Sequence, residues 1–174
     1  TTTETFAVTV NPVNDAPTVS EILDQSFEED NTSGAIAFTI GDIETPAESL
    51  TVSATSDNQA LISDGNITLS GTDENRTLEL TSVSNESGTA NITVTVDDGT
   101  ETTTETFAVT VNPVNDAPTA TADSFSTDED SVFTTGNVLD NDTDVDGDML
   151  TVSAIDVTST IGEVIDNEDG TFNI

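Results

Sequence analysis

Apolar and polar residues alternate along most of this chain, which is the pattern of β-strands with one buried face. Clear examples are Ile36, Phe38 and Ile40, and later Ile92 to Val96. β-Branched residues are common in these runs, and Gly, Asn, Asp, Ser or Pro bound each run. The pattern predicts seven strands, over residues 19–27, 34–40, 50–56, 61–63 with 67–69, 77–83, 90–96 and 104–111.

Turn signals separate these runs. Asp98-Gly99 lies between the last two predicted strands, and Asp64-Gly65 interrupts the fourth. No segment shows the period of a helix. Seven short strands in about 100 residues predict an all-β fold of the immunoglobulin-like sandwich type.

The chain contains an internal repeat. Residues 1–18, TTTETFAVTVNPVNDAPT, recur unchanged as residues 102–119. A period of about 100 residues suits a tandem array of separately folded sandwiches, because solenoid repeats run roughly 20 to 50 residues. We therefore expect residues 1–15 to be the last strand and linker of a preceding repeat, residues 16–116 to be a complete sandwich, and residues 117–174 to begin the next.

The second unit is predicted to repeat the strand order with segments near residues 132–133, 150–155, 162–165 and 171–174, which is half a sandwich. We expect further sequence to supply the remaining strands, and keep open the alternative that another molecule donates them. No run approaches the ~18 apolar residues of a membrane span, and no signal-peptide pattern is present. Any export signal or anchor is expected outside this segment.

The charge balance is strongly acidic, with one basic residue, Arg76, against 35 carboxylates and a formal net charge of -34. Nucleic acid is excluded as a partner, because binding phosphates requires Lys and Arg. Anionic membrane surfaces are disfavoured for the same reason. The chain has no Cys, so no disulfide braces it, and no Lys for an isopeptide crosslink.

Acidic residues cluster at fixed distances from the linkers. In the complete unit they are residues 28–30, Asp42 with Glu44, and residues 97–98; residues 128–130 and 141–148 repeat the first two clusters. Two like charges about 4 Å apart repel by ~1 kcal/mol in water and ~4 kcal/mol at an effective dielectric near 20. Such clusters therefore predict a hard cation, and Ca²⁺ fits their Asp, Glu and Asn oxygens. Zinc does not fit, because His and Cys are absent. The alternative is that the acids only solvate turns, and we assign no ligand role to Asp24, Asp57, Glu79, Glu101 and Glu105.

The string DTDVDGD at residues 142–148 matches the start of an EF-hand loop. The twelfth loop position is Ser153 rather than a bidentate Glu, and the predicted flanks are strands. We interpret Asp142, Asp144 and Asp146 as parts of a calcium-binding turn between strands.

Taken together, the Val-Asn-Asp-Ala-Pro linker, the Glu cluster after it, the acidic pair fifteen residues further on and the final Asp-Asp-Gly hairpin resemble bacterial cadherin-like repeats. The partial unit is similar to the VCBS class found in large secreted adhesins of the repeats-in-toxin type. The resemblance implies cadherin-like sandwiches in tandem with Ca²⁺ at each junction.

For the second junction the resemblance implies ligands from Glu29, Glu86, Asn115, Asp116, Asp144 and Asp146. For the first junction it implies Asn14, Asp15, Glu44 and Asp98. Pro46 stands where Asp146 stands in the other unit, so the first junction is expected to hold fewer ions.

The function expected from this resemblance is that of calcium-stiffened extender repeats of a bacterial cell-surface or secreted adhesin, in cell adhesion and biofilm formation. Its partners would be neighbouring repeats of the same chain, and surface polysaccharide or further copies. Catalysis is not expected, because His, Cys, Lys, Tyr and Trp are absent and the carboxylates lie in polar turns. Two alternatives remain open: a calcium-dependent carbohydrate-binding module, and a surface-filament subunit completed by strand donation.

Overall fold

The computed structural model describes residues 1–128, 130–158 and 163–174. These residues fall into two compact units, Thr1–Val114 and Asn115–Ile174, called unit 1 and unit 2 below. The described residues form strands, turns and two short 3-10 helices, η1 (Ala47–Ser49) and η2 (Asp64–Asn66). Neither helix has the length or apolar character that a membrane span requires.

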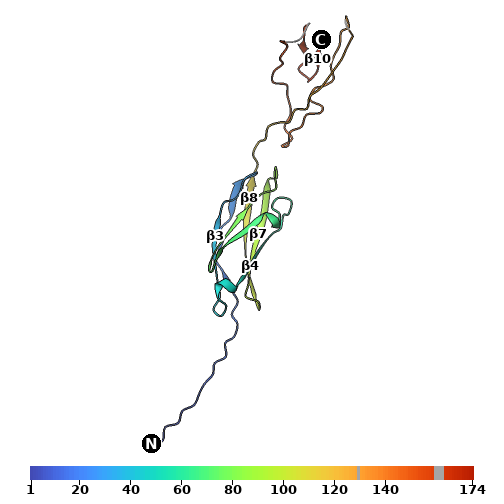
Figure 1. Cartoon of the computed structure of the whole chain (residues 1–174). Helices are drawn as coiled ribbons and strands as arrows, with labels where there is room; N and C mark the ends of the chain where they lie inside the picture. Colours follow the sequence, from blue (N-terminus) through green and yellow to red (C-terminus); the bar gives the residue numbers. More distant parts are fainter. Residues whose placement is uncertain (129, 159–162) are drawn as a thin grey trace. The chain divides into compact units, whose positions relative to one another are not determined.

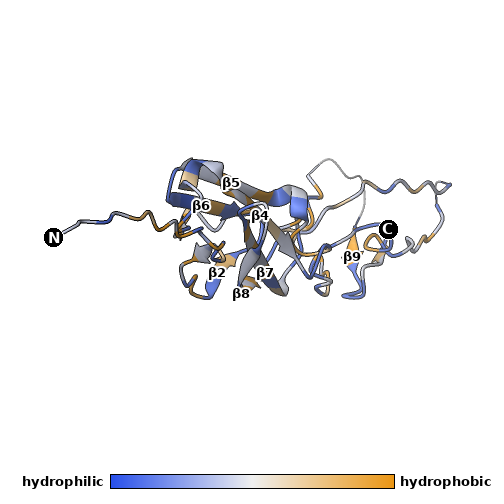
Figure 2. Cartoon of the chain, turned by 90° about the horizontal axis from the view of Figure 1, so that it is seen from below, coloured by the Kyte–Doolittle hydropathy of each residue, from blue (hydrophilic) through white to orange (hydrophobic). Residues whose placement is uncertain are grey.

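Unit 1 is a sandwich of two four-stranded sheets (Figure 1). One sheet has the order β1-β3-β6-β5, with strands Thr18–Val19, Ile36–Gly41, Asn75–Leu80 and Ile67–Thr72. The other has the order β2-β8-β7-β4, with strands Gln25–Glu28, Thr102–Asn112, Gly88–Asp97 and Thr51–Ser56. Figure 2 shows β5 and β6 in one layer, and β2, β7 and β8 in the other.

The strand order confirms the immunoglobulin-like fold. The first strand segment, β1, joins the sheet of β3, β6 and β5, and the remaining strands β4, β7 and β8 form the facing sheet. After β1 the chain crosses to this facing sheet, where β2 pairs in parallel with β8, the last strand of the unit. Gln25 lies opposite Val109 and Glu28 lies opposite Asn112. The second strand, β2, and the last strand, β8, therefore lie side by side.

Alternating residues of both sheets fill the core. Ile92, Val94 and Val96 of β7 are fully buried, as are Leu78 and Leu80 of β6. Each such side chain stabilises the fold by roughly 1.5–3 kcal/mol relative to an exposed one. The hydrophobic effect thus fixes the register of the long β7–β8 hairpin, because a shift by one residue would turn these side chains outward.

The prediction of one strand over residues 19–27 was wrong. The structure has two short strands there, β1 and β2, in different sheets. Val19, Ile22 and Phe27 all turn toward the core, and their uneven spacing cannot fit the period of a single strand. Between the strands, the Ile22 amide donates to Glu105 Oε1 (3.2 Å) and the Ala108 amide donates to Asp24 Oδ1 (2.9 Å).

Residues 61–63 are also not a strand. Leu61 and Ile62 are consecutive and both buried, which a two-residue period does not allow. The amides of both residues donate to the carbonyl of Asn58, so the chain makes a turn that places both side chains in the core.

Residues 1–10 were predicted to be a strand, and they form none. The same sequence forms most of β8, where Phe107, Val109 and Val111 are at most 3% exposed. In the first copy the equivalent Phe6 is 88% exposed. The difference arises because β7 and β2 flank β8, whereas no described strand pairs with residues 1–10.

Unit 2 has little regular pairing. Its strands are β9 (Ile165–Asp166) and β10 (Phe172–Asn173), which pair with each other. The strands predicted at residues 132–133 and 150–155 do not form, although residues 150–154 repeat the LTVSA of residues 50–54. In unit 1 this sequence pairs with β7, and no described strand of unit 2 takes that place. Glu129 of the first acidic cluster and Gly162 of the third predicted strand lie outside the described residues.

Several acids stabilise turns of the sandwich. Asp57 Oδ1 accepts from the Asn91 amide (2.7 Å), and its Oδ2 accepts from Asn91 Nδ2 (2.8 Å). These hydrogen bonds, the backbone one foremost, lower the pKa of Asp57 below its ordinary value. The contact fastens the chain after β4 to the edge of β7.

The pH dependence of stability follows from this contact. A lowered pKa means that the ionised Asp57 stabilises the fold above the unfolded-state pKa of about 3.9, and that this contribution disappears as the pH falls through the folded-state value. We expect Asp57→Asn to be less stable than wild type at pH 6, with the difference shrinking below pH 4. Urea unfolding at pH 6, 4 and 3 measures this difference in the free energy of unfolding. Glu79→Gln, which also removes one negative charge, is the matched control. A difference that stays constant over this range would contradict the prediction.

Candidate metal centres at the two linkers

The first linker, residues 11–17, is held at one end of unit 1 by two loops. Asn14 Nδ2 donates to Asp98 Oδ2 (2.9 Å), and the Asp15 amide donates to Glu44 Oε2 (3.1 Å). Asp98 lies in the β7–β8 turn and Glu44 in the β3–β4 loop, while Pro17 beyond them is fully buried. The four residues predicted for the first junction therefore come together in the structure.

Asp98 is held ionised at this end of the sandwich. The amides of Thr100 and Glu101 donate to its Oδ1, and Asn14 donates to its Oδ2. These hydrogen bonds, with the Glu101 amide foremost, lower the pKa of Asp98. The carboxylate is therefore a negative charge next to the linker at neutral pH.

Asp42 is a further residue of this site that the sequence-based assignment left out. Its Oδ1 accepts from the amides of Glu44 (2.9 Å) and Thr45 (2.6 Å), which shapes the β3–β4 loop. Its Oδ2 is buried and has no hydrogen-bond partner among the described residues. A buried anionic oxygen without a donor is costly, and a cation would remove that cost. Its spacing from Glu44, matched by Asp142 and Asp144, was the available sequence signal.

Glu29 lies at the opposite end of unit 1 and is 3% exposed. Its Oε1 accepts from the Val114 amide (2.7 Å), and its own amide donates to the Asn112 carbonyl (2.9 Å). Buried carboxylates are normally paired with a cation or a metal. The chain's one basic residue, Arg76, donates instead to the carbonyls of Gly71 and Ala47.

Glu86, predicted as a ligand together with Glu29, is exposed in the β6–β7 loop. The structure connects this loop to the Glu29 loop through the Asn85 amide, which donates to Asp30 Oδ1 (3.1 Å). Glu29 and Glu86 belong to unit 1, whereas Asn115, Asp116, Asp144 and Asp146 belong to unit 2.

In unit 2 the DTDVDGD loop lies against the end of the second linker, residues 112–118. The Asp116 amide donates to Asp146 Oδ2 (2.7 Å), and the Thr121 amide donates to Asp142 Oδ1 (2.7 Å). Asp144 Oδ1 accepts from the amides of Asp146 (3.0 Å) and Asp148 (3.2 Å). The bend requires Gly147, whose φ is +77°.

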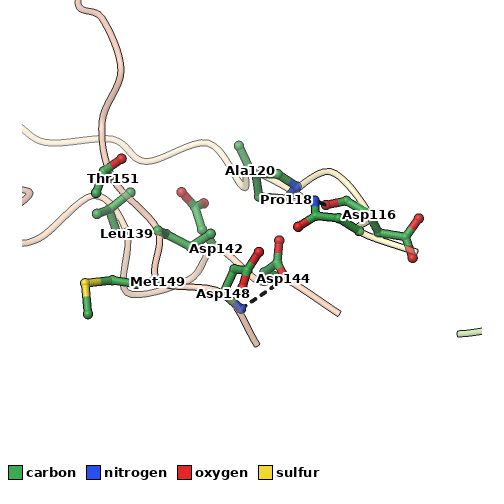
Figure 3. A pocket seen from close by; sticks show the side chains of 11 residues that line it. Asp116, Pro118, Ala120, Leu139, Asp142, Asp144, Asp148, Met149 and Thr151 are labelled. Atoms are coloured by element: carbon green, nitrogen blue, oxygen red, sulfur yellow. Dashed lines mark hydrogen bonds between the residues drawn. The ribbon is translucent and has the colours of Figure 1, made fainter. Parts of the chain in front are cut away.

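A hollow of about 310 Å³ lies between this loop and the linker residues (Figure 3). Asp116, Asp142, Asp144 and Asp148 line it, together with Asn115. Figure 3 shows Asp142, Asp144 and Asp148 reaching into the same region, beside the segment that carries Asp116. The residues that the sequence predicts as ligands in unit 2 are therefore neighbours.

The two identical linkers use different acceptors. The Asp15 amide bonds to Glu44, but the equivalent amide of Asp116 bonds to Asp146 rather than to Asp144, which is aligned with Glu44. Pro46 occupies the place of Asp146 in unit 1 and offers no carboxylate. The longer side chain of Glu44 takes over that role.

Over the described ranges, no three or more Asp, Glu, His or Cys side chains are grouped closely enough to hold a metal ion by themselves. Their carboxylate oxygens are turned toward backbone amides, which separates the like charges. Ca²⁺ also takes amide and backbone carbonyl oxygens, and Asn14 and Asn115 provide these beside the acids. The donors at each linker thus suit calcium chemically, and binding requires side chains such as Asp144 to exchange amide donors for the ion.

The comparison with protein families concerns unit 2. Residues 114–174 match the model of the cadherin-like domain. The matched segment is 61 of the 174 residues, and it contains the second linker from Val114 onward and the whole DTDVDGD loop. The cadherin-like character predicted for the partial unit is thereby supported. No curated protein matches the chain.

Solved structures resemble the chain only distantly. Titin domain M7 is 20% identical, covering 59% of this chain and 99% of that one, with a TM-score of 0.44. The titin domains Z1Z2 in complex with telethonin are 16% identical over 93% of this chain and 81% of that one, also at 0.44. Domains 4 and 5 of the S-layer protein SbsC are 20% identical over 59% of this chain and 47% of that one, at 0.40. Similarities of this size carry no argument about function.

Proposed function

We propose that this chain belongs to the calcium-stiffened extender repeats of a large bacterial surface or secreted adhesin, and that it works outside the cell. The supporting observation is that both linkers, identical in sequence, are hydrogen-bonded to acidic loops of the domain that follows them. The match of residues 114–174 to the cadherin-like domain supports the same proposal.

Calcium would act on the freedom of the linker. A short linker normally lets adjacent domains swing, because little surface crosses the boundary. At each linker one backbone amide reaches a carboxylate of the following domain, and an ion shared by Asp15 and Glu44, or by Asp116 and Asp146, would add a much stronger restraint. Extracellular calcium modules bind at about 10⁻⁴ to 10⁻³ M, so the array would be stiff outside the cell and loose at cytosolic calcium.

The proposal also includes a stiffening role for Glu29. This buried carboxylate holds the amide of Val114, so the second linker is fastened at its start to unit 1. Asp146 fastens the same linker two residues later to unit 2. No catalytic role is proposed, because the acids lie in polar turns rather than in an apolar pocket.

Isothermal titration of the chelator-treated chain with calcium tests the proposal. We expect wild type to bind calcium with millimolar or tighter affinity, Asp42→Asn to lose binding at the first linker, and Asp144→Asn to lose binding at the second. Glu79→Gln, on the outer face of β6, is the matched control and should bind as wild type does. The proposal is wrong if wild type shows no binding up to 10 mM calcium, or if Glu79→Gln loses as much binding as the other variants.

A further inference from the structure

Arg76 occupies a position where the strand pattern calls for an apolar residue. It shares the inward face of β6 with Leu78 and Leu80, both fully buried, and lies opposite Phe38 of β3. Arg is seldom placed inward unless its donors are used, and Nε of Arg76 is buried with no hydrogen-bond partner among the described residues, which leaves the two terminal nitrogens. Here Nη1 donates to the Gly71 carbonyl and Nη2 to the Ala47 carbonyl, each at 3.1 Å.

These hydrogen bonds join the Arg76 side chain to strand β5 and to the β3–β4 loop. Gly71 lies in β5, directly opposite Arg76 in the β5–β6 register, and Ala47 begins η1 in the β3–β4 loop. The same loop carries Asp42 and Glu44, the two carboxylates beside the first linker. Arg76, the chain's one basic residue, therefore holds the β3–β4 loop through the Ala47 carbonyl. Both terminal nitrogens of its side chain donate to backbone oxygens.

The loop of unit 1 lacks one hydrogen bond that the loop of unit 2 makes, because of Pro46. In unit 2, Asp144 Oδ1 accepts from the amides of Asp146 and Asp148, so the loop is closed by its own residues. Proline has no amide hydrogen, so Pro46 cannot make the bond that Asp146 makes. In unit 1, Asp42 accepts from the Glu44 and Thr45 amides, and the Pro46 carbonyl accepts from the Ser49 amide (2.8 Å). The Arg76 bond to the Ala47 carbonyl ties this part of the loop to β6.

We propose that Arg76 is a positioning residue for the β3–β4 loop: it sets the loop so that Glu44 meets the Asp15 amide, and thereby tunes the affinity of the first linker for a divalent cation. The second part rests on the proposed function. A merely electrostatic effect has the opposite sign, since removing a positive charge near a cation site strengthens cation binding. Loss of a residue that orients metal ligands typically weakens binding 10- to 100-fold.

The test uses the full chain carrying Asp144→Asn. This change is expected to abolish calcium binding at the second linker, so that the titration reports on the first linker. Arg76→Met removes the charge and the donors but keeps an apolar stem, and Arg76→Lys keeps the charge and one donor point. Calcium affinity is measured by titration, and exchange of the Asp15 amide by hydrogen–deuterium exchange in the calcium-free protein. Protection of the Val94 amide in β7 checks that each variant is folded.

We expect Arg76→Met to bind calcium about tenfold more weakly and to exchange the Asp15 amide faster, with Arg76→Lys intermediate in both. Unchanged or tighter calcium binding together with unchanged exchange would overturn the proposal and leave Arg76 a core residue of the fold. If the parent binds no calcium, the proposed function fails at this linker, and the exchange of Asp15 alone decides whether Arg76 positions the loop.

Discussion

Replacing Phe107 by alanine is expected to lower the free energy of unfolding of unit 1 by about 3–5 kcal/mol, the usual cost of deleting a buried aromatic side chain. Phe107 is 3% exposed in β8, opposite Ile92 of β7. A domain of about 100 residues has a total stability of roughly 5–15 kcal/mol. The variant should therefore lose a large share of its stability.

The chain contains its own control for this experiment. Phe6 has the same neighbours in sequence, TETFAVT, but is 88% exposed and pairs with no described strand. Phe6→Ala should change stability by less than about 0.5 kcal/mol. Urea unfolding of both variants, followed by far-UV circular dichroism, measures the difference. Equal effects at the two positions would mean that residues 1–10 pair with something in solution, or that β8 is not part of the core.

The second large effect is expected from calcium. A site at 100 times its dissociation constant adds about 2.7 kcal/mol to the folded state. For a domain of this size, 1 kcal/mol shifts Tm by roughly 4–8 °C, so saturating the first linker should raise the Tm of unit 1 by about 10 °C or more. Scanning calorimetry with 10 mM calcium and then with excess chelator measures the shift.

The variant Asp42→Asn separates a bound ion from general charge screening. In the chelated protein it should be slightly more stable than wild type, because it removes the buried, unpartnered negative charge of Asp42 Oδ2. With calcium it should gain much less than wild type does. Sodium chloride at matched ionic strength is the second control, because a net charge of -34 responds to any salt. An equal rise of Tm in sodium and calcium would contradict specific binding.

The sequence predicted the sandwich well where strands alternate over their full length. β3, β4 and the β7–β8 hairpin follow their apolar patterns to within one or two residues at most ends. The division of the first strand could also have been predicted, since Val19, Ile22 and Phe27 do not keep a period of two. Leu61 and Ile62 carry the same signal, because adjacent apolar residues cannot share one face of a strand.

Two predicted strands, at residues 1–10 and 150–155, do not form for a reason that the local sequence does not reveal. The eleven residues of β8 and the segment LTVSA each occur twice, and each forms a strand in one place and none in the other. Strand formation depends on a partner to satisfy the backbone hydrogen bonds, which is a property of the rest of the chain.

The linker sites were predictable as groups of residues but not in detail. The family resemblance grouped Asn14, Asp15, Glu44 and Asp98, and hydrogen bonds join Asn14 to Asp98 and Asp15 to Glu44 in the structure. The resemblance could not show that Asp146 rather than Asp144 receives the Asp116 amide, because that depends on side-chain length and on how the loop turns. The burial of Asp42 Oδ2 likewise follows from packing around the β3–β4 loop.

The parallel pairing of β2 with β8 has a mechanical consequence. The polypeptide passes through the short β1 and then β2 at the start of the sandwich, and it leaves unit 1 directly after β8. β2 and β8 run in the same direction with four residue pairs between them. Tension that draws the two ends of the unit apart must slide one strand along the other, so it loads these hydrogen bonds in shear, all at once. The β2–β8 hydrogen bonds would break one after another only under a force perpendicular to the strands. A chain pulled along its length does not apply such a force.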